Sequence, residues 1–228
     1  MPARLSGAEY GTWTSPLVAR TMSRTSLSST SNTGAGVMAQ APTPSHWDHD
    51  KRERLRQIIK ARSLLTGAEF KLASGGQSGF FFDMKKTMFH PEGASLVGDI
   101  IFEMIADDDD VQYIGGLEIG AIPVVVSVSV RSWPTRPINA FFVRKAPKDH
   151  GAINLIDGQF RPNSKVILFE DVTTTGGSVM KAVRAVRDRG CTVKKILTIV
   201  DRGQGAAKNL KEENLELVPI FTMDHFSD

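Results

Sequence analysis

The sequence predicts an α/β fold in which helices flank an open, mainly parallel sheet. Three apolar runs have the length of strands and are apolar on both faces: INAFFVRK (residues 138–145), SKVILFEDV (164–172) and KKILTIVDR (194–202). Such strands occur where helices cover both sides of a parallel sheet. Between the last two runs, segment 177–190 has apolar residues at helical spacing and ends at Gly190. This regular alternation of strand and helix predicts the fold class.

The first 46 residues differ in composition from the rest of the chain. They are rich in serine and threonine, poor in acids and without sustained periodicity, so we expect them to lie outside the fold. Three interpretations stay open: a disordered extension, a start assigned too far upstream with Met38 as the true start, and an organelle transit peptide. Residues 47–228 then form the folded domain.

Further elements follow in order along this domain. Segment 47–65 carries Leu55, Ile58 and Ile59, then Leu64 and Leu65, near helical spacing, which predicts an amphipathic helix. Segment 91–110 opens with a proline, which favours a helix start there. Segment 112–130 has the pattern of a short strand, a glycine turn and an apolar segment.

Composition excludes several classes of protein. None of the apolar stretches in the 228 residues approaches the length of roughly 20 residues that a helix needs to span a bilayer, so we do not expect an integral membrane protein. The net charge is +3, of which residues 1–46 carry +2, so the body is nearly neutral and nucleic acid is not an expected partner. A lone cysteine, Cys191, cannot form an internal disulfide, which fits a reducing compartment such as the cytoplasm.

Two acids and a polar turn follow the strand at 164–172. Ligands of open α/β sheets collect at the carboxyl ends of strands, where Glu170 and Asp171 lie. Their carboxylates can accept hydrogen bonds from sugar hydroxyls. The next residues combine hydroxyl donors with glycines that let a backbone approach a phosphate at a helix start: Val172, Thr173, Thr174, Thr175, Gly176, Gly177 and Ser178. The stretch therefore predicts a site for a ribose 5-phosphate.

Rival interpretations of this turn fit less well. A nucleotide P-loop requires a lysine after its glycines, and the turn has none there. The spaced glycines of a dinucleotide site are also absent, and a simple helix cap would not explain the acids. The turn resembles the phosphoribosyl pyrophosphate (PRPP) signature of type I phosphoribosyltransferases. That resemblance implies their fold, with a small N-terminal hood region.

A basic segment at 141–158 narrows the activity. Arg144, Lys145, Lys148 and His150 place four potential cations within seven residues, with Gly151 as a candidate hinge. Such a loop could close over a pyrophosphate leaving group, exclude water and neutralise its charge. Its RKxxKDHG pattern is similar to the catalytic loop of orotate phosphoribosyltransferases. The resemblance implies a homodimer, because in that family the loop reaches into the neighbouring subunit's site.

Two further segments match the same family. In FKLASGGQSGFFFD (70–83), we expect the phenylalanines in the core, with one ring able to stack on a planar base. Arg202 follows a strand end and could pair bidentately with a carboxylate, which orotate has and purines lack. The resemblance implies orotate contacts at Phe81, Phe82, Thr174 and Arg202.

The chain also departs from the family pattern. Ala73 and Ile119 stand where many members have lysines that touch PRPP, so those contacts are not expected here. The resemblance covers about residues 50–228.

The resemblance implies a pentosyltransferase of pyrimidine (UMP) biosynthesis that makes orotidine 5′-monophosphate and pyrophosphate from orotate and PRPP. Arg144, Lys145, Lys148, His150 and Asp171 would be its catalytic residues. Mg²⁺ is expected to arrive with PRPP, held mainly by substrate oxygens and water, with no protein metal site. Two alternatives stay open: a purine-type phosphoribosyltransferase and a regulator that senses PRPP.

Overall fold

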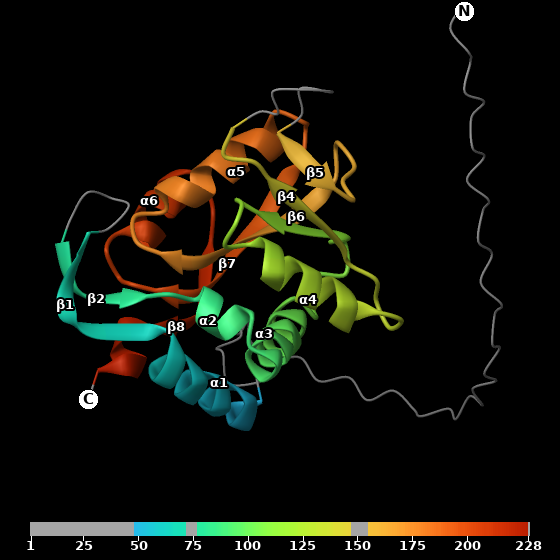
Figure 1. The fold of residues 1–228 in the computed structure, drawn as a ribbon. Helices are drawn as coiled ribbons and strands as arrows, with labels where there is room; N and C mark the ends of the chain where they lie inside the picture. Colours follow the sequence, from blue (N-terminus) through green and yellow to red (C-terminus); the bar gives the residue numbers. More distant parts are fainter. Residues whose placement is uncertain (1–47, 72–76, 147–154, 228) are drawn as a thin grey trace, which may run out of the picture. The chain divides into compact units, whose positions relative to one another are not determined.

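A six-stranded sheet forms the centre of the fold, with strand order β5-β4-β3-β6-β7-β8 (Figure 1). The computed structural model describes residues 48–71, 77–146 and 155–227. The strands of the central sheet are β3 (Tyr113–Gly116), β4 (Asn139–Val143), β5 (Ile156–Gly158), β6 (Lys165–Thr173), β7 (Thr192–Asp201) and β8 (Leu217–Thr222). Neighbours pair in parallel except β4 and β5, which are antiparallel. The predicted fold class is confirmed.

Helices cover both faces of this sheet (Figure 1). Helices α1 (His49–Arg62), α3 (Pro91–Met104) and α4 (Ile122–Ser132) lie on one face, and α5 (Gly177–Arg187) and α6 (Ala206–Glu212) lie on the other. Each face has its own apolar cluster: Ile167 and Phe169 of β6 belong to the first, and Val166 and Leu168 to the second. Alternate residues of one strand thus point into two cores, which explains why the run is apolar throughout.

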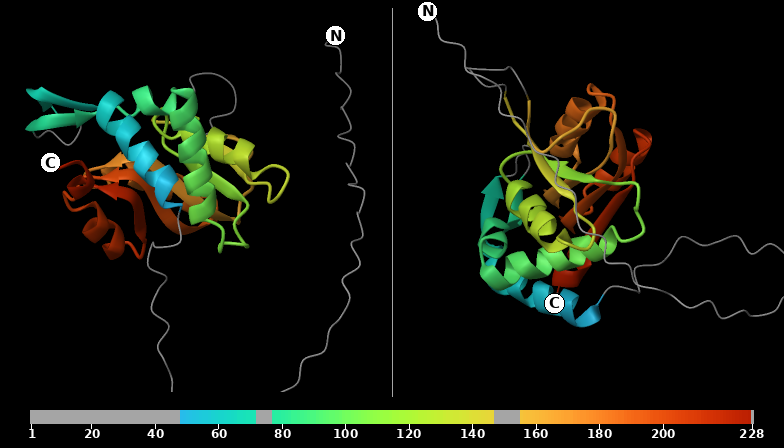
Figure 2. Two further views of the ribbon diagram at one scale, coloured as in Figure 1. Left: turned by 90° about the horizontal axis from the view of Figure 1, so that it is seen from below. Right: turned by 90° about the vertical axis from the view of Figure 1, so that its right-hand side faces the viewer.

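A β-hairpin stands apart from the central sheet and forms the small N-terminal hood. Strands β1 (Leu64–Lys71) and β2 (Gln77–Phe82) pair antiparallel in a two-stranded sheet of their own. Figure 2 shows this hairpin extending to the side from the end of α1. The predicted helical spacing of Leu64 and Leu65 is wrong, because α1 ends at Arg62 and Leu64 already pairs with Phe82 in the hairpin.

Helix α4 is formed by the apolar segment IPVVVSVSVRS, which has no strong helical propensity. Its stability comes from burial of one stripe, Val124, Val125 and Val128, in the same cluster as Val97 and Ile101 of α3. Tertiary packing therefore decides the state of this segment.

The C-terminal edge of the chain adds elements that the sequence had not indicated. Strand β8 is an edge strand, where a proline such as Pro219 is tolerated. A 3-10 turn, η1 (Met223–Phe226), follows it and buries Phe226 against Phe82 of the hairpin, with ring centroids 5.2 Å apart. A short helix, α2 (Lys85–Met88), links the hairpin to α3. None of the helices in the described segments is long and apolar enough to cross a bilayer.

Candidate functional site

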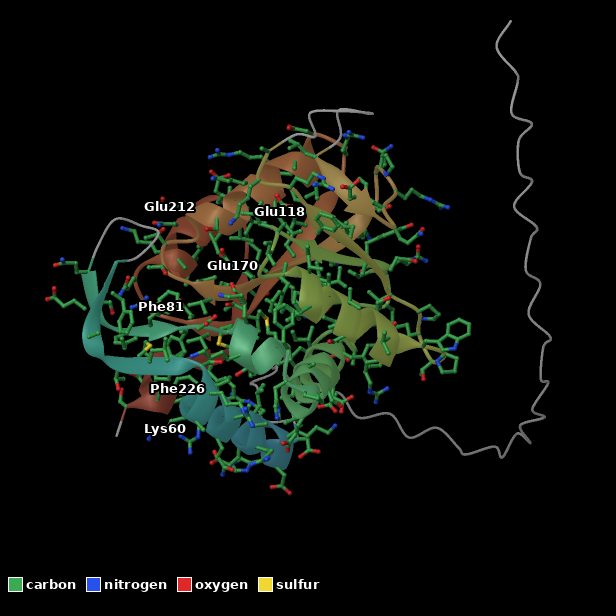
Figure 3. The ribbon with its side chains drawn as sticks, in the orientation of Figure 1. Lys60, Phe81, Glu118, Glu170, Glu212 and Phe226 are labelled. Atoms are coloured by element: carbon green, nitrogen blue, oxygen red, sulfur yellow. The ribbon has the colours of Figure 1, made fainter. Side chains whose placement is uncertain are left out.

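The acidic pair lies at the carboxyl end of β6, in the middle of the central sheet. Glu170 and Asp171 precede the last residues of the strand, and neighbouring β7 ends at Asp201, in register with Thr173. Figure 3 shows Glu170 near the middle of the sheet, with Phe81 on the hairpin to one side of it. The loops that leave β6 and β7 therefore emerge together, as expected for a ligand site of an open α/β sheet.

Burial raises the pKa of both carboxyl groups. Desolvation, reinforced by the charge of Asp171, raises the pKa of Glu170 to about 7, although Ser178 and the N–H of Val179 donate hydrogen bonds to it. Burial also raises the pKa of Asp171, while the Val172 N–H, 3.0 Å from Oδ1, opposes the shift. Glu170 thus changes charge near neutral pH, and it can donate or accept a hydrogen bond with a sugar hydroxyl.

A cavity of about 400 Å³ opens beside Glu170, at the start of α5. Its lining consists of Glu170, Val172, Thr174, Thr175, Gly176, Gly177, Ser178 and Lys181. Gly176 is the N-cap of α5 and has φ +83°, a left-handed conformation that favours glycine. The cavity combines one titrating carboxyl, hydroxyl donors and the N–H groups of a helix start, which suits a phosphorylated sugar.

Thr173 is the member of the predicted phosphate turn that does not line this cavity. It is fully buried as the last residue of β6, and its Oγ1 donates to Asp201 Oδ1 at 3.1 Å. Its hydroxyl therefore joins β6 to the end of β7. The backbone carbonyl of Thr173 also accepts a hydrogen bond from the N–H of Arg202 at 3.0 Å.

The loop after β3 closes tightly on Asp171. An added Cβ at Gly120 would lie 2.8 Å from Asp171 Oδ1 and 2.9 Å from Oδ2, so only glycine leaves room for this carboxylate. On the side of the hairpin, Lys85 Nζ lies 2.6 Å from Asp83 Oδ1, and the fields of both residues act on Asp171. Asp171 therefore has backbone close on one side, while the charge of Lys85 lowers its pKa and that of Asp83 raises it.

Arg202 lies deep at the same edge of the sheet, with only 6% of its surface exposed. Its guanidinium carbon is 4.5 Å from the centroid of the Phe80 ring, and Nη2 donates to Ser78 Oγ at 2.8 Å. Burial lowers its pKa. In the described part of the chain no carboxylate pairs with Arg202, and its buried Nε has no hydrogen-bond partner. A buried cation without an acid suits an anionic ligand.

The three consecutive phenylalanines of strand β2 have different surroundings. Phe82 is 5% exposed and packs in the core, and Phe81 stacks on Phe70 with centroids 5.8 Å apart. Phe80, for which the sequence predicted no ligand contact, lies with its ring under the guanidinium of Arg202. The structure therefore places Phe80 against the guanidinium of Arg202, whereas the ring of Phe82 lies in the core.

The basic segment is described only at its ends. Arg144 Nη2 lies 2.5 Å from Asp157 Oδ2, and the N–H of Lys145 donates to Glu118 Oε1 at 2.8 Å. Lys148, His150 and Gly151 lie outside the described residues, as does Ala73. Ile119, the position of the other missing lysine, is 62% exposed. Within the described ranges there is no group of three or more side chains that could hold a metal ion.

Known proteins with similar sequences are named orotate phosphoribosyltransferase. An orotate phosphoribosyltransferase of Methanocaldococcus jannaschii is 42% identical over 174 residues, which cover 76% of this chain and 96% of that protein. One from Rhodopseudomonas palustris is 44% identical over 180 residues, covering 77% and 95%. No family model matches the chain. The chain belongs to the orotate phosphoribosyltransferase family.

Solved orotate phosphoribosyltransferases have the same fold. A Mycobacterium tuberculosis structure in complex with Fe(III) dicitrate superposes with a TM-score of 0.69 at 34% identity, covering 78% of this chain and 99% of that one. A structure of the M. tuberculosis enzyme in complex with PRPP has a TM-score of 0.65 at 30% identity, covering 80% and 95%. The resemblance inferred from the four sequence motifs is confirmed, and the purine-type alternative is not favoured.

Three residues that lie around this candidate site were not predicted from the sequence: Phe80, Lys85 and Lys181. Phe80 could have been predicted, because the motif at 70–83 was identified and only the question of which of its three adjacent rings lies beside Arg202 was open. The other two give no sequence signal, because a lysine in the second turn of a helix or beside a hairpin is common on any surface. Only the folded chain shows that Lys181 lines the cavity and that the charge of Lys85 acts on Asp171.

Proposed function

We propose that the chain transfers the phosphoribosyl group of PRPP to N1 of orotate, which gives orotidine 5′-monophosphate and pyrophosphate. The observation that carries the choice of base is Arg202, a buried guanidinium over Phe80 that has no carboxylate partner among the described residues. Orotate has a carboxylate for this guanidinium and a planar ring for stacking. Thr174, in the wall of the neighbouring cavity, is the second proposed polar contact of the base.

In this proposal the acid pair binds the ribose during the transfer from pyrophosphate to orotate. The bond from the anomeric carbon to the pyrophosphate oxygen breaks, the bond to orotate N1 forms, and the N1 proton passes to solvent. Positive charge develops on the ribose as pyrophosphate departs. The carboxyl groups of Glu170 and Asp171 bind the ribose hydroxyls and stabilise that charge. The close approach of Gly120 leaves the Asp171 carboxylate little room to move, which favours a preorganised site.

The cations of the basic segment are proposed to neutralise the leaving pyrophosphate. Arg144, Lys145, Lys148 and His150 supply four donors in a short stretch of chain. Arg144 is paired with Asp157, and we expect it to exchange this partner for pyrophosphate. Mg²⁺ fits as a companion of PRPP, since it is commonly held by one or two carboxylates together with substrate phosphates. We expect substrate oxygens and water to hold most of its coordination sites, and the ion would supply charge neutralisation.

We also propose that the chain forms a homodimer, in which the basic segment of one subunit completes the site of the other. Helix α4 exposes an apolar stripe of Val126 (49%), Val130 (72%) and the following Trp133 (72%), spaced on one helical face. An exposed apolar face of this kind favours association. We therefore propose that the second subunit of the dimer packs against this stripe.

Two experiments test the dimer. Val130→Asp should convert the dimer to monomers in analytical ultracentrifugation, whereas Lys208→Asp on the other face of the sheet should not. Mixing Lys148→Ala with Arg202→Met subunits, each of low activity alone, should restore about one quarter of wild-type activity, because half of the dimers then carry one intact site. No restoration in mixed dimers would show that each basic segment serves its own subunit.

The decisive test of activity follows the loss of orotate absorbance with purified protein, PRPP and Mg²⁺. Adenine, hypoxanthine and uracil serve as control bases, and Arg202→Met as the control protein. Turnover specific for orotate and dependent on PRPP is the expected result. Turnover of a purine instead would keep the fold and overturn the role of Arg202, and PRPP binding without any turnover would favour the PRPP-sensing alternative. A location in the cytoplasm stays a prediction.

A further inference from the structure

Lys181 is the single positively charged residue among the described residues that line the cavity at the start of α5. The other lining groups are one titrating carboxyl, a valine, two threonines, two glycines and a serine. We propose that Lys181 binds the 5′-phosphate of PRPP and supplies positive charge that the start of α5 alone does not provide. This assignment rests on the proposed function, because it concerns how that substrate is held.

The geometry of α5 directs Lys181 toward the phosphate turn. Val179, Ala182 and Val183 face the core and are buried, which leaves Ser178 and Lys181 on the opposite side. Residues three apart lie on one face of a helix, and helical side chains lean toward the N-terminus. The ammonium of Lys181 therefore extends back over the first turn of α5, where Ser178 and the open N–H groups lie.

The charge balance of the cavity also needs a cation. The N-terminus of a helix offers only about half a positive charge, whereas a phosphate monoester carries between about −1.5 and −2 near pH 7. Glu170 lines the same cavity and opposes the phosphate when it is ionised. Among the described residues, no acid forms an ion pair with Lys181, so its ammonium is available to the phosphate.

Binding measurements separate this role from a general structural one. In calorimetric titrations at low salt, Lys181→Ala should bind ribose 5-phosphate about tenfold more weakly, since one charge-assisted contact is lost. Its affinity for pyrophosphate should stay within twofold, because that ligand belongs to the basic segment. In steady-state assays the KM for PRPP should rise while kcat changes little, and Lys181→Arg should restore the binding.

Arg184→Ala is the matched control. Arg184 is exposed one turn farther along α5 and does not line the cavity, so its removal changes the net charge equally without touching the proposed contact. Unchanged ribose 5-phosphate binding in Lys181→Ala, or an equal loss in Arg184→Ala, would overturn the assignment. Because the titration needs no turnover, a wild-type protein that binds ribose 5-phosphate but leaves orotate unchanged would disprove the activity and not the role of Lys181.

Discussion

Replacing Glu170 by glutamine should stabilise the folded protein at pH 8 far more than at pH 5. Glu170 is a carboxyl group whose burial, beside Asp171, raises its pKa from 4.5 to about 7. Glutamine keeps an oxygen that can accept the bonds from Ser178 and the Val179 N–H, but it never carries a charge. The substitution therefore removes the cost of an ionised group while preserving the local hydrogen bonds.

The sign and size follow from the linkage between protonation and folding. In the unfolded chain Glu170 ionises near pH 4.5, whereas in the fold it keeps its proton up to about pH 7, so the wild type loses stability as pH rises through this window. A tenfold change in an acid dissociation constant corresponds to about 1.4 kcal/mol, so the loss approaches about 3 kcal/mol above pH 7 and stays below about 1 kcal/mol at pH 5. Glutamine should recover that difference.

Urea unfolding of the ligand-free protein at pH 5, 6, 7 and 8 measures this effect. The free energy of unfolding of Glu170→Gln should exceed that of the wild type by an amount that grows with pH. Glu212→Gln removes a carboxylate from an exposed position of α6 and controls for the change in net charge. A constant advantage at all four pH values would refute the buried-charge argument, and activity should fall because the ribose loses an ionisable partner.

Three further substitutions probe the site. Gly120→Ala places a Cβ 2.8 Å from Asp171 Oδ1, so the carboxylate must move and kcat/KM for PRPP should fall about 10²-fold while the melting temperature changes little. Arg202→Lys keeps the charge but loses the planar fork, so the KM for orotate should rise by about tenfold or more with the KM for PRPP unchanged; equal effects on both substrates would contradict an orotate site. Lys148→Ala should slow single-turnover chemistry by about 10²–10³ if it neutralises pyrophosphate, and a loss under tenfold would exclude that role.

Local patterns in the sequence determined much of the fold and the centre of the site. Strands β4, β6 and β7 and helix α5 follow from short apolar runs and one helical period, which depend on near neighbours along the chain. The acid pair and the threonine–glycine turn are contiguous, so their joint position at a strand end could be predicted. The resemblance of the motifs to a known family further predicted orotate as the base and pyrophosphate as the leaving group.

Other features depend on contacts between distant segments, and only the tertiary structure decided them. The segment at 122–132 is a helix because α3 buries its valines, against its own propensity. Arg202 is buried because a hairpin 124 residues earlier brings Ser78 and Phe80 to it. The approach of Gly120 to Asp171 and the place of Lys181 in the cavity arise in the same way. Sequence periodicity reports which face of an element is apolar, but which partner meets that face is fixed by the packing of the whole chain.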